Sequence, residues 1–164
     1  MKLELFFAVS TLSVLPWWLL MIGLPQWRVT QRLLRSPIVL LPLPILYGVL
    51  AVWNWPLLAH LVENPTLSGV SLILGEPEGA LLAWIHFLAL DFFAGRWIYL
   101  DSLERQLPGL AVVPILWATL LVAPIGLLLY LVLRSFTAPP EPAPESPPPA
   151  QVLLAALPKK PVRN

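Results

Sequence analysis

The sequence contains no cysteine and few charged residues. The absence of cysteine excludes disulfide bonds, thiolate metal sites and cysteine nucleophiles. Charged residues make up 12% of the 164 residues, whereas a soluble domain carries about 25%. The formal net charge is only +1, so nothing in the bulk charge points to a nucleic-acid partner and we expect none.

Common catalytic and cofactor motifs are also missing. The chain has no Gly-rich phosphate loop and no GxSxG nucleophile motif. Its two histidines, His60 and His86, show neither HxxxH nor ExxH spacing, so we expect no metal site. No lysine lies in a long apolar stretch, which excludes a lysine-bound retinal. We therefore expect no cofactor.

Apolar residues dominate what is present, at 58% of the chain. Four apolar segments are long enough to cross a bilayer, at about residues 5–25, 38–62, 80–100 and 110–134. The sequence thus predicts an all-α integral membrane four-helix bundle over residues 1–136. Residues 137–164 contain seven prolines between Pro139 and Pro149, and this composition predicts a disordered or extended tail.

The segments between the spans differ in charge. Arg28, Arg32 and Arg35 are spaced for one face of a short helix, which is typical either of a cytoplasmic loop or of a site for anionic lipid headgroups. With Arg105 on the same side, the count predicts both termini on the non-cytoplasmic side. The apolar run 67–74 is expected to lie on the membrane or dip into it.

The third apolar segment carries polar residues that an anchor would not need. His86, Asp91 and Arg96 lie inside it, where a charge costs roughly 2.5 kcal/mol or more on insertion scales. Successive members are five residues apart, or about 140° around a helix axis, so the three side chains cannot share one face. Each is therefore expected to meet a different neighbour.

Several roles remain open for these residues. Asp91 is either protonated or meets a cation, and it serves either an interhelical hydrogen bond or catalysis. Arg96 either contacts a neighbour or reaches the membrane interface. Glu78 either complements a helix N-terminus or handles a proton. Asp101 and Arg105 are expected to pair because they are four residues apart.

The third segment also carries a sequence that resembles a known family. Residues 86–102 read HFLALDFFAGRWIYLDS, and they resemble the signature of the plant and cyanobacterial membrane family named after the abscisic-acid-deficient-4 protein. LPWWLLM at 15–21 and LPQWRVT at 24–30 resemble its first helix and first loop. Glu78–Gly79 precedes the signature, and PIGLLLY at 124–130 resembles the last helix. The similarity covers about residues 5–134.

This resemblance implies a four-helix membrane protein tied to xanthophyll metabolism, which in plants is the conversion of violaxanthin to neoxanthin. That isomerisation needs one acid and one base but no redox cofactor. The candidate catalytic residues are His86, Asp91 and Glu78. The expected ligand or helix contacts are Trp84, Gly95, Arg96, Trp97 and Asp101.

Two functions stay open on this basis. One is a cofactor-independent isomerase acting on an epoxy-carotenoid, and the other is a non-catalytic carotenoid-binding or membrane-complex assembly protein. The expected partners are membrane lipid and a carotenoid, with a homo-oligomer or a larger membrane complex as further options. A span that starts almost directly after Met1–Lys2 favours a bacterial, cyanobacterial source, in an inner or thylakoid membrane, with plant relatives in plastid membranes.

Overall fold

The computed structural model describes residues 2–63 and 65–137, and within these ranges every regular element is helical. The all-α prediction is confirmed, whereas a simple four-helix bundle is not. The elements are, in chain order, α1 (Lys2–Gly23), α2 (Arg28–Arg35), the 3-10 helix η1 (Pro37–Leu40), α3 (Pro42–Trp53), α4 (Trp55–Glu63), α5 (Leu67–Gly75), α6 (Pro77–Glu104), α7 (Gly109–Leu121) and α8 (Ala123–Ser135). Of the predicted tail, residues 138–164 lie outside the described ranges.

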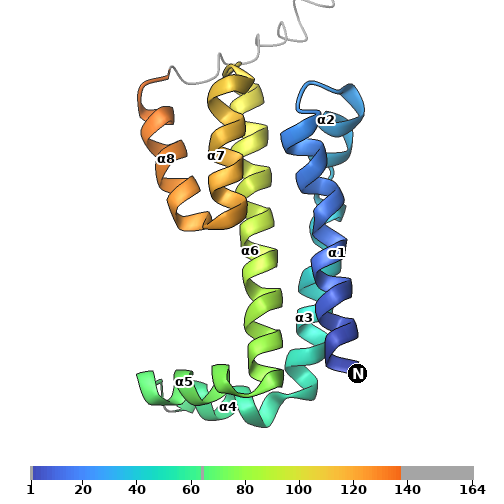
Figure 1. Cartoon of the computed structure of the whole chain (residues 1–164), viewed down its shortest axis with the longest axis vertical. Helices are drawn as coiled ribbons and strands as arrows, with labels where there is room; N and C mark the ends of the chain where they lie inside the picture. Colours follow the sequence, from blue (N-terminus) through green and yellow to red (C-terminus); the bar gives the residue numbers. More distant parts are fainter. Residues whose placement is uncertain (1, 64, 138–164) are drawn as a thin grey trace, which may run out of the picture.

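Helix α6 is the longest element, and the other helices are arranged around it (Figure 1). It begins with a proline whose missing N–H suits a first helical position, and Glu78 places an acid in its first turn. It ends at Glu104, and Gln106 follows with a positive φ of 53°. Helices α1 and α3 run along one side of α6, and α7 and α8 pack against the other (Figure 1).

The segment predicted as a second span, 38–62, is divided. Helix α3 ends at Trp53, and Asn54 closes it by donating its Nδ2 to the Leu50 carbonyl oxygen at 2.8 Å. Pro56 follows in the first turn of α4, and it cannot continue α3 because proline lacks an N–H and its ring clashes with the preceding turn. The chain therefore turns here, and α4 and α5 lie across the lower end of the molecule in Figure 1.

The segment predicted as a fourth span, 110–134, forms a helical hairpin. Helix α7 ends at Leu121, Val122 is not helical (φ −150°, ψ 86°), and α8 returns antiparallel beside α7 (Figure 1). Pro124 explains the break, since proline lacks an N–H and its ring clashes with a continuing helix. Gly126 lets the two helices approach closely, because a Cβ there would overlap the backbone of Thr119. The tip of the hairpin stops well short of α4 and α5 (Figure 1).

The ends of the described chain lie at opposite ends of the molecule. Helix α1 starts at the lower end in Figure 1, and α8 finishes at the upper end, where α2 lies. The sequence predicted both termini on one side. The described chain differs because the α7–α8 hairpin returns it to the upper end in Figure 1, where α7 begins. Arg134, in the last turn of α8, therefore lies at the same end of the molecule as the arginines of α2. Glu63 and Glu76 lie toward the opposite end.

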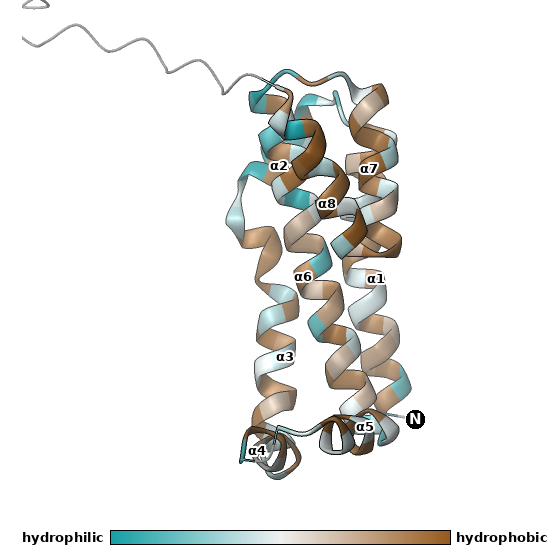
Figure 2. Ribbon diagram, turned by 90° about the vertical axis from the view of Figure 1, so that its left-hand side faces the viewer, coloured by the Kyte–Doolittle hydropathy of each residue, from teal (hydrophilic) through white to brown (hydrophobic). Residues whose placement is uncertain are grey.

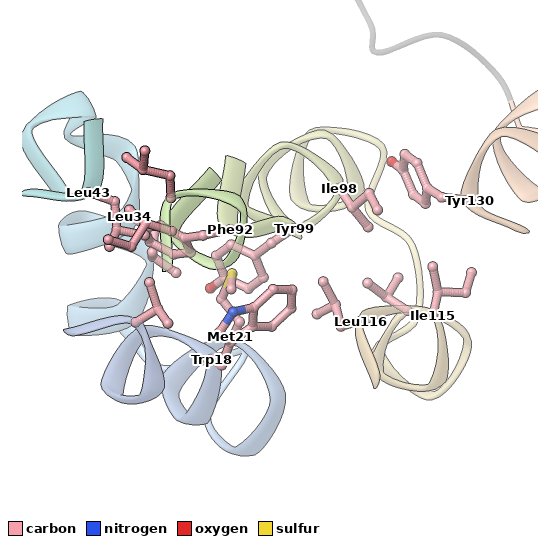
Figure 3. Packing of buried hydrophobic residues seen from close by; sticks show 14 of the residues in the cluster. Trp18, Met21, Leu34, Leu43, Phe92, Ile98, Tyr99, Ile115, Leu116 and Tyr130 are labelled. Atoms are coloured by element: carbon pink, nitrogen blue, oxygen red, sulfur yellow. The ribbon is translucent and has the colours of Figure 1, made fainter. Parts of the chain in front are cut away.

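The buried core follows the length of α6. Trp18 and Met21 of α1 pack near Phe92 and Tyr99 of α6, and Leu116 of α7 closes the opposite side (Figure 3). All five side chains are at most 2% exposed. Close packing of large side chains against one helix fixes its rotation about its axis. That rotation decides which polar residues of α6 face the core and which face outward.

Two helices in the described ranges, α1 and α6, are long and apolar enough to cross a membrane. The number rises to three if α2 and the following segment Pro37–Trp53, bent by 73° relative to each other, count as one broken span. Hydrophobic colouring covers most of α1, α3 and α6, and hydrophilic colouring gathers around α2 (Figure 2). Large exposed side chains such as Leu12, Leu19 and Val52 suit a lipid environment.

Candidate functional site

Two of the candidate catalytic residues line one recess beside α6. This space, which we call the hairpin recess, has a volume of about 700 Å³. Its upper wall is the tip of the α7–α8 hairpin, and its side wall is the middle of α6. The lining residues are Trp84, His86, Phe87, Leu88, Leu90, Asp91, Phe93, Ala94, Leu120, Leu121, Val122, Ala123, Pro124 and Leu127.

His86 and Asp91 are the ionisable side chains of this recess. They are five residues apart, or about 7.5 Å along the helix axis. The expectation that these two residues point in very different directions thus needs refining. The recess is wide enough around α6 to include both.

The two side chains differ in their neighbours. The His86 ring lies 5.7 Å from the ring of Tyr47 on α3 and 6.2 Å from that of Phe87, measured between centroids. Asp91 is half-buried and makes no hydrogen bond or ion pair within residues 2–63 and 65–137. An acid without a partner in an otherwise apolar recess is costly, and such residues are frequently functional.

Glu78, the third candidate, lies elsewhere. It occupies the first turn of α6, eight residues before His86, and it is not among the lining residues of the hairpin recess. Eight residues correspond to about 12 Å along the axis. Its position fits the helix-start interpretation, in which an acid complements the N-terminal dipole.

Trp84 is held in place by α1. Its indole Nε1 donates to the Thr11 hydroxyl at 3.0 Å, and its ring stacks on Phe7 with a centroid distance of 5.1 Å. One face of the indole therefore borders the hairpin recess while the N–H is already satisfied. Trp84 thus offers a ligand an aromatic surface rather than a hydrogen-bond donor.

Gly95 permits a close approach between α1 and α6. A Cβ at this position would overlap the indole of Trp18, which is 2% exposed. The sequence predicted Gly95 as a contact for a ligand or a helix, in the space that its missing side chain leaves. In the structure, a tryptophan of a neighbouring helix occupies that space.

Arg96 joins α6 to the end of α2. Its Nε donates to the Leu34 carbonyl oxygen at 2.6 Å, and its Nη2 donates to that of Arg35 at 3.1 Å. These carbonyls belong to the last turn of α2, which has no following turn to satisfy them. Tyr99, one turn further on, donates its hydroxyl to the Pro25 carbonyl oxygen at 2.6 Å. Both residues fasten the 24–35 region to α6.

Asp101 and Trp97 fasten α8 in the same manner. The Asp101 Oδ2 atom accepts from Arg105 Nε at 2.8 Å, from Arg134 Nε at 3.0 Å and from the Tyr130 hydroxyl at 2.5 Å. The predicted pairing with Arg105 is confirmed. Trp97 meets Tyr130 edge to face at 5.4 Å, and the Arg134 guanidinium lies 5.8 Å from the Trp97 ring centre. We call this group the α8 anchor.

The signature therefore divides into two parts along α6. Its first part, with His86 and Asp91, faces a recess. Its second part, from Gly95 to Asp101, holds α1, α2 and α8 in place. No three His, Asp or Glu side chains among the described residues are grouped as metal ligands would be. The side chain of His60 is not among those described.

Sequence reasoning missed several residues of the site. Nothing in the sequence indicated that Tyr47 lies beside His86, because aromatic residues are common in apolar helices. The hairpin tip was hidden within one continuous apolar run, although Pro124 marked the break. Tyr130 was noticed only through the family resemblance, yet it and Arg134 complete the α8 anchor.

Comparison with known proteins supports the resemblance. The ABA DEFICIENT 4-like family model matches residues 5–130. The chain is 31% identical over 135 residues to Protein ABA DEFICIENT 4, chloroplastic, of Arabidopsis thaliana, over 79% of this chain and 60% of that protein. The chain thus spans about three fifths of the length of this relative. No solved structure matches. The extent of the family match shows that this chain belongs to the ABA DEFICIENT 4-like family.

Proposed function

We propose that this chain is a multi-pass membrane protein that binds a carotenoid in the hairpin recess and isomerises its epoxide end group. The observation that carries the proposal is the placement of His86 and Asp91 together in one otherwise apolar recess. Family membership supports the substrate class, because the family resemblance implies xanthophyll metabolism. The long apolar helices α1 and α6 support the membrane location.

The proposed reaction requires one proton donor and one proton acceptor. The donor protonates the epoxide oxygen as one carbon–oxygen bond breaks, and the oxygen becomes a hydroxyl group. The acceptor removes a proton from the neighbouring chain carbon, whose electron pair forms the second double bond of an allene. One proton is gained and one is lost, so no oxidant or reductant is consumed. His86 and Asp91 supply these two functions.

The recess suits a polyene beyond these two groups. Its other lining residues are aliphatic or aromatic, and the Trp84 ring forms part of the wall. Apolar walls with a few placed polar groups are typical of small-molecule sites. The same walls would also hold a carotenoid without reacting with it, which favours a non-catalytic carotenoid-binding or assembly protein as the second candidate.

The test uses His86→Ala and Asp91→Asn in a carotenoid-producing host that makes violaxanthin. Loss of a general acid or base lowers rates by about 100-fold or more, so we expect both variants to lose the allenic product while a carotenoid still co-purifies from membranes. Glu104→Gln is the matched control, because Glu104 is an exposed acid of the same helix outside the recess. Pigments are identified by chromatography.

The outcomes separate the candidates. Full conversion by folded His86→Ala and Asp91→Asn proteins refutes the isomerase and leaves the binding protein. A protein that purifies from membranes without any pigment refutes both candidates. A chain that is not recovered in the membrane fraction refutes the proposed location.

A further inference from the structure

A second recess lies next to the hairpin recess and shares one wall with it. This space, which we call the α1 recess, has a volume of about 390 Å³. Trp84 borders both recesses. The lining residues of the α1 recess are Leu3, Glu4, Phe7, Pro77, Ala80, Leu81 and Trp84.

One stripe of α6 passes from the first recess into the second. Pro77, Leu81, Trp84, Leu88 and Asp91 recur every three or four residues, so they lie on the same side of the helix. The first three line the α1 recess and the last three line the hairpin recess. From end to end the stripe measures about 21 Å at 1.5 Å per residue, and each recess borders about half of it.

The polar groups lie at the two ends of this stripe. Asp91 occupies the hairpin end, His86 lies five residues before it in the same recess, and Glu4 lies at the α1 end, level with the start of α6. The walls between them are apolar, with Leu88 on one side of Trp84 and Leu81 on the other. This pattern is complementary to an extended apolar molecule with a polar group at each end.

Trp84 is placed to guide a ligand between the recesses. Its contacts with Thr11 and Phe7 fix the indole against α1, and the side chain remains 37% exposed. A fixed aromatic ring with a free surface stacks favourably on a flat conjugated chain. The ring therefore forms a shared wall along which one molecule passes.

We propose that the two recesses form one track, which takes a single elongated isoprenoid with hydroxylated rings at both ends. The ring that reacts lies at His86 and Asp91, and the distal ring lies in the α1 recess near Glu4. The inference rests on the proposed function for the identity of the reacting end, and it adds that the α1 recess recognises the length of the molecule.

The test fills the α1 recess and compares a long probe with a short one. Ala80 is exposed and lines this recess, so Ala80→Trp blocks it without disturbing the core. Ala8→Trp is the matched control, since Ala8 is exposed on α1 and lines neither recess. The probes are zeaxanthin, which carries a hydroxylated ring at each end, and retinol, which has half as many carbons. Binding in detergent micelles is followed by quenching of tryptophan fluorescence, and both variants contain the same number of tryptophans.

We expect Ala80→Trp to raise the Kd for zeaxanthin about ten-fold, as when roughly two methylene groups are no longer buried. The Kd for retinol should stay unchanged in both variants, because retinol fits within the hairpin recess.

Unchanged zeaxanthin binding in Ala80→Trp overturns the track but leaves the hairpin recess as the binding site. Equal weakening of both probes also overturns it, because the α1 recess would then not sense length. If the unmodified protein binds neither probe, the proposed function itself fails.

Discussion

Replacing Asp101 by Asn should loosen the α7–α8 hairpin from α6. The carboxylate is 12% exposed and accepts three hydrogen bonds through one oxygen, from Arg105, Arg134 and Tyr130. Asparagine keeps the size and one acceptor oxygen but removes the negative charge. The two guanidinium groups then lose the negative charge of Asp101, while the shape of the side chain hardly changes.

The magnitude follows from the exposure of each partner. A hydrogen bond to a charged group contributes about 1.5–3 kcal/mol, and the Arg105 side chain, 7% exposed, lies in that regime. The Arg134 side chain is 39% exposed, so solvent screening reduces the contribution of the Arg134–Asp101 ion pair to stability to about 0.5 kcal/mol. With the retained amide oxygen, we expect the free energy of unfolding to fall by about 2–3 kcal/mol.

The assay is equilibrium unfolding in mixed detergent micelles for Asp101→Asn, Tyr130→Phe and the double variant. Phenylalanine at 130 keeps the edge-to-face contact with Trp97 and removes only the hydroxyl. Residues in direct contact show coupling of about 0.5–3 kcal/mol in such a cycle. Glu104→Gln, an exposed acid of the same helix, should stay within about 0.5 kcal/mol of the unmodified protein. An Asp101→Asn protein as stable as that control, or strictly additive changes, would refute the anchoring role.

Two further variants test the contacts of α1 and α2. Gly95→Ala should lower the free energy of unfolding by about 1–3 kcal/mol, because the new Cβ overlaps the buried Trp18 ring. Gly23→Ala is the control and should be near neutral in the same unfolding assay, because a Cβ there meets open space. Equal effects of the two substitutions would contradict the packing argument. Arg96→Gln should speed amide hydrogen exchange in α2 by about ten-fold, since the Leu34 and Arg35 carbonyls lose a charged donor worth about 1.5 kcal/mol. Arg32→Gln, on the exposed side of α2, is its control, and unaltered exchange in Arg96→Gln would show that α2 does not depend on this link.

Local features of the fold were predictable from the sequence, whereas contacts between distant segments were not. The Asp101–Arg105 pair follows from helical spacing alone. Its other partners, Tyr130 and Arg134, are 29 and 33 residues away. Only the packing of α8 on α6 brings them within hydrogen-bonding distance, and apolar helix faces do not specify one partner from sequence.

The candidate site was predictable in its residues but not in its surroundings. His86 and Asp91 stood out because charge is rare in apolar segments. The wall opposite them was harder to predict, because hydropathy reports only how apolar residues 110–134 are, and Pro124 alone indicates where the chain turns. The partners of Arg96 were not predictable either, because they are backbone carbonyl groups of α2. Every residue has such a group, so the sequence does not indicate which of them an arginine binds.

The break at Val122 has a consequence for membrane topology. A continuous helix over 110–134 would add one crossing, but a hairpin that enters and leaves by the same side adds none. The candidate crossings among the described residues are therefore α1 and α6, with the bent segment from α2 to α3 as a third if it counts as one broken span. The single turn before Pro124 thus brings the end of α8 back to the end of the molecule that holds the arginines of α2, whereas a continuous helix would have ended at the level of α4 and α5.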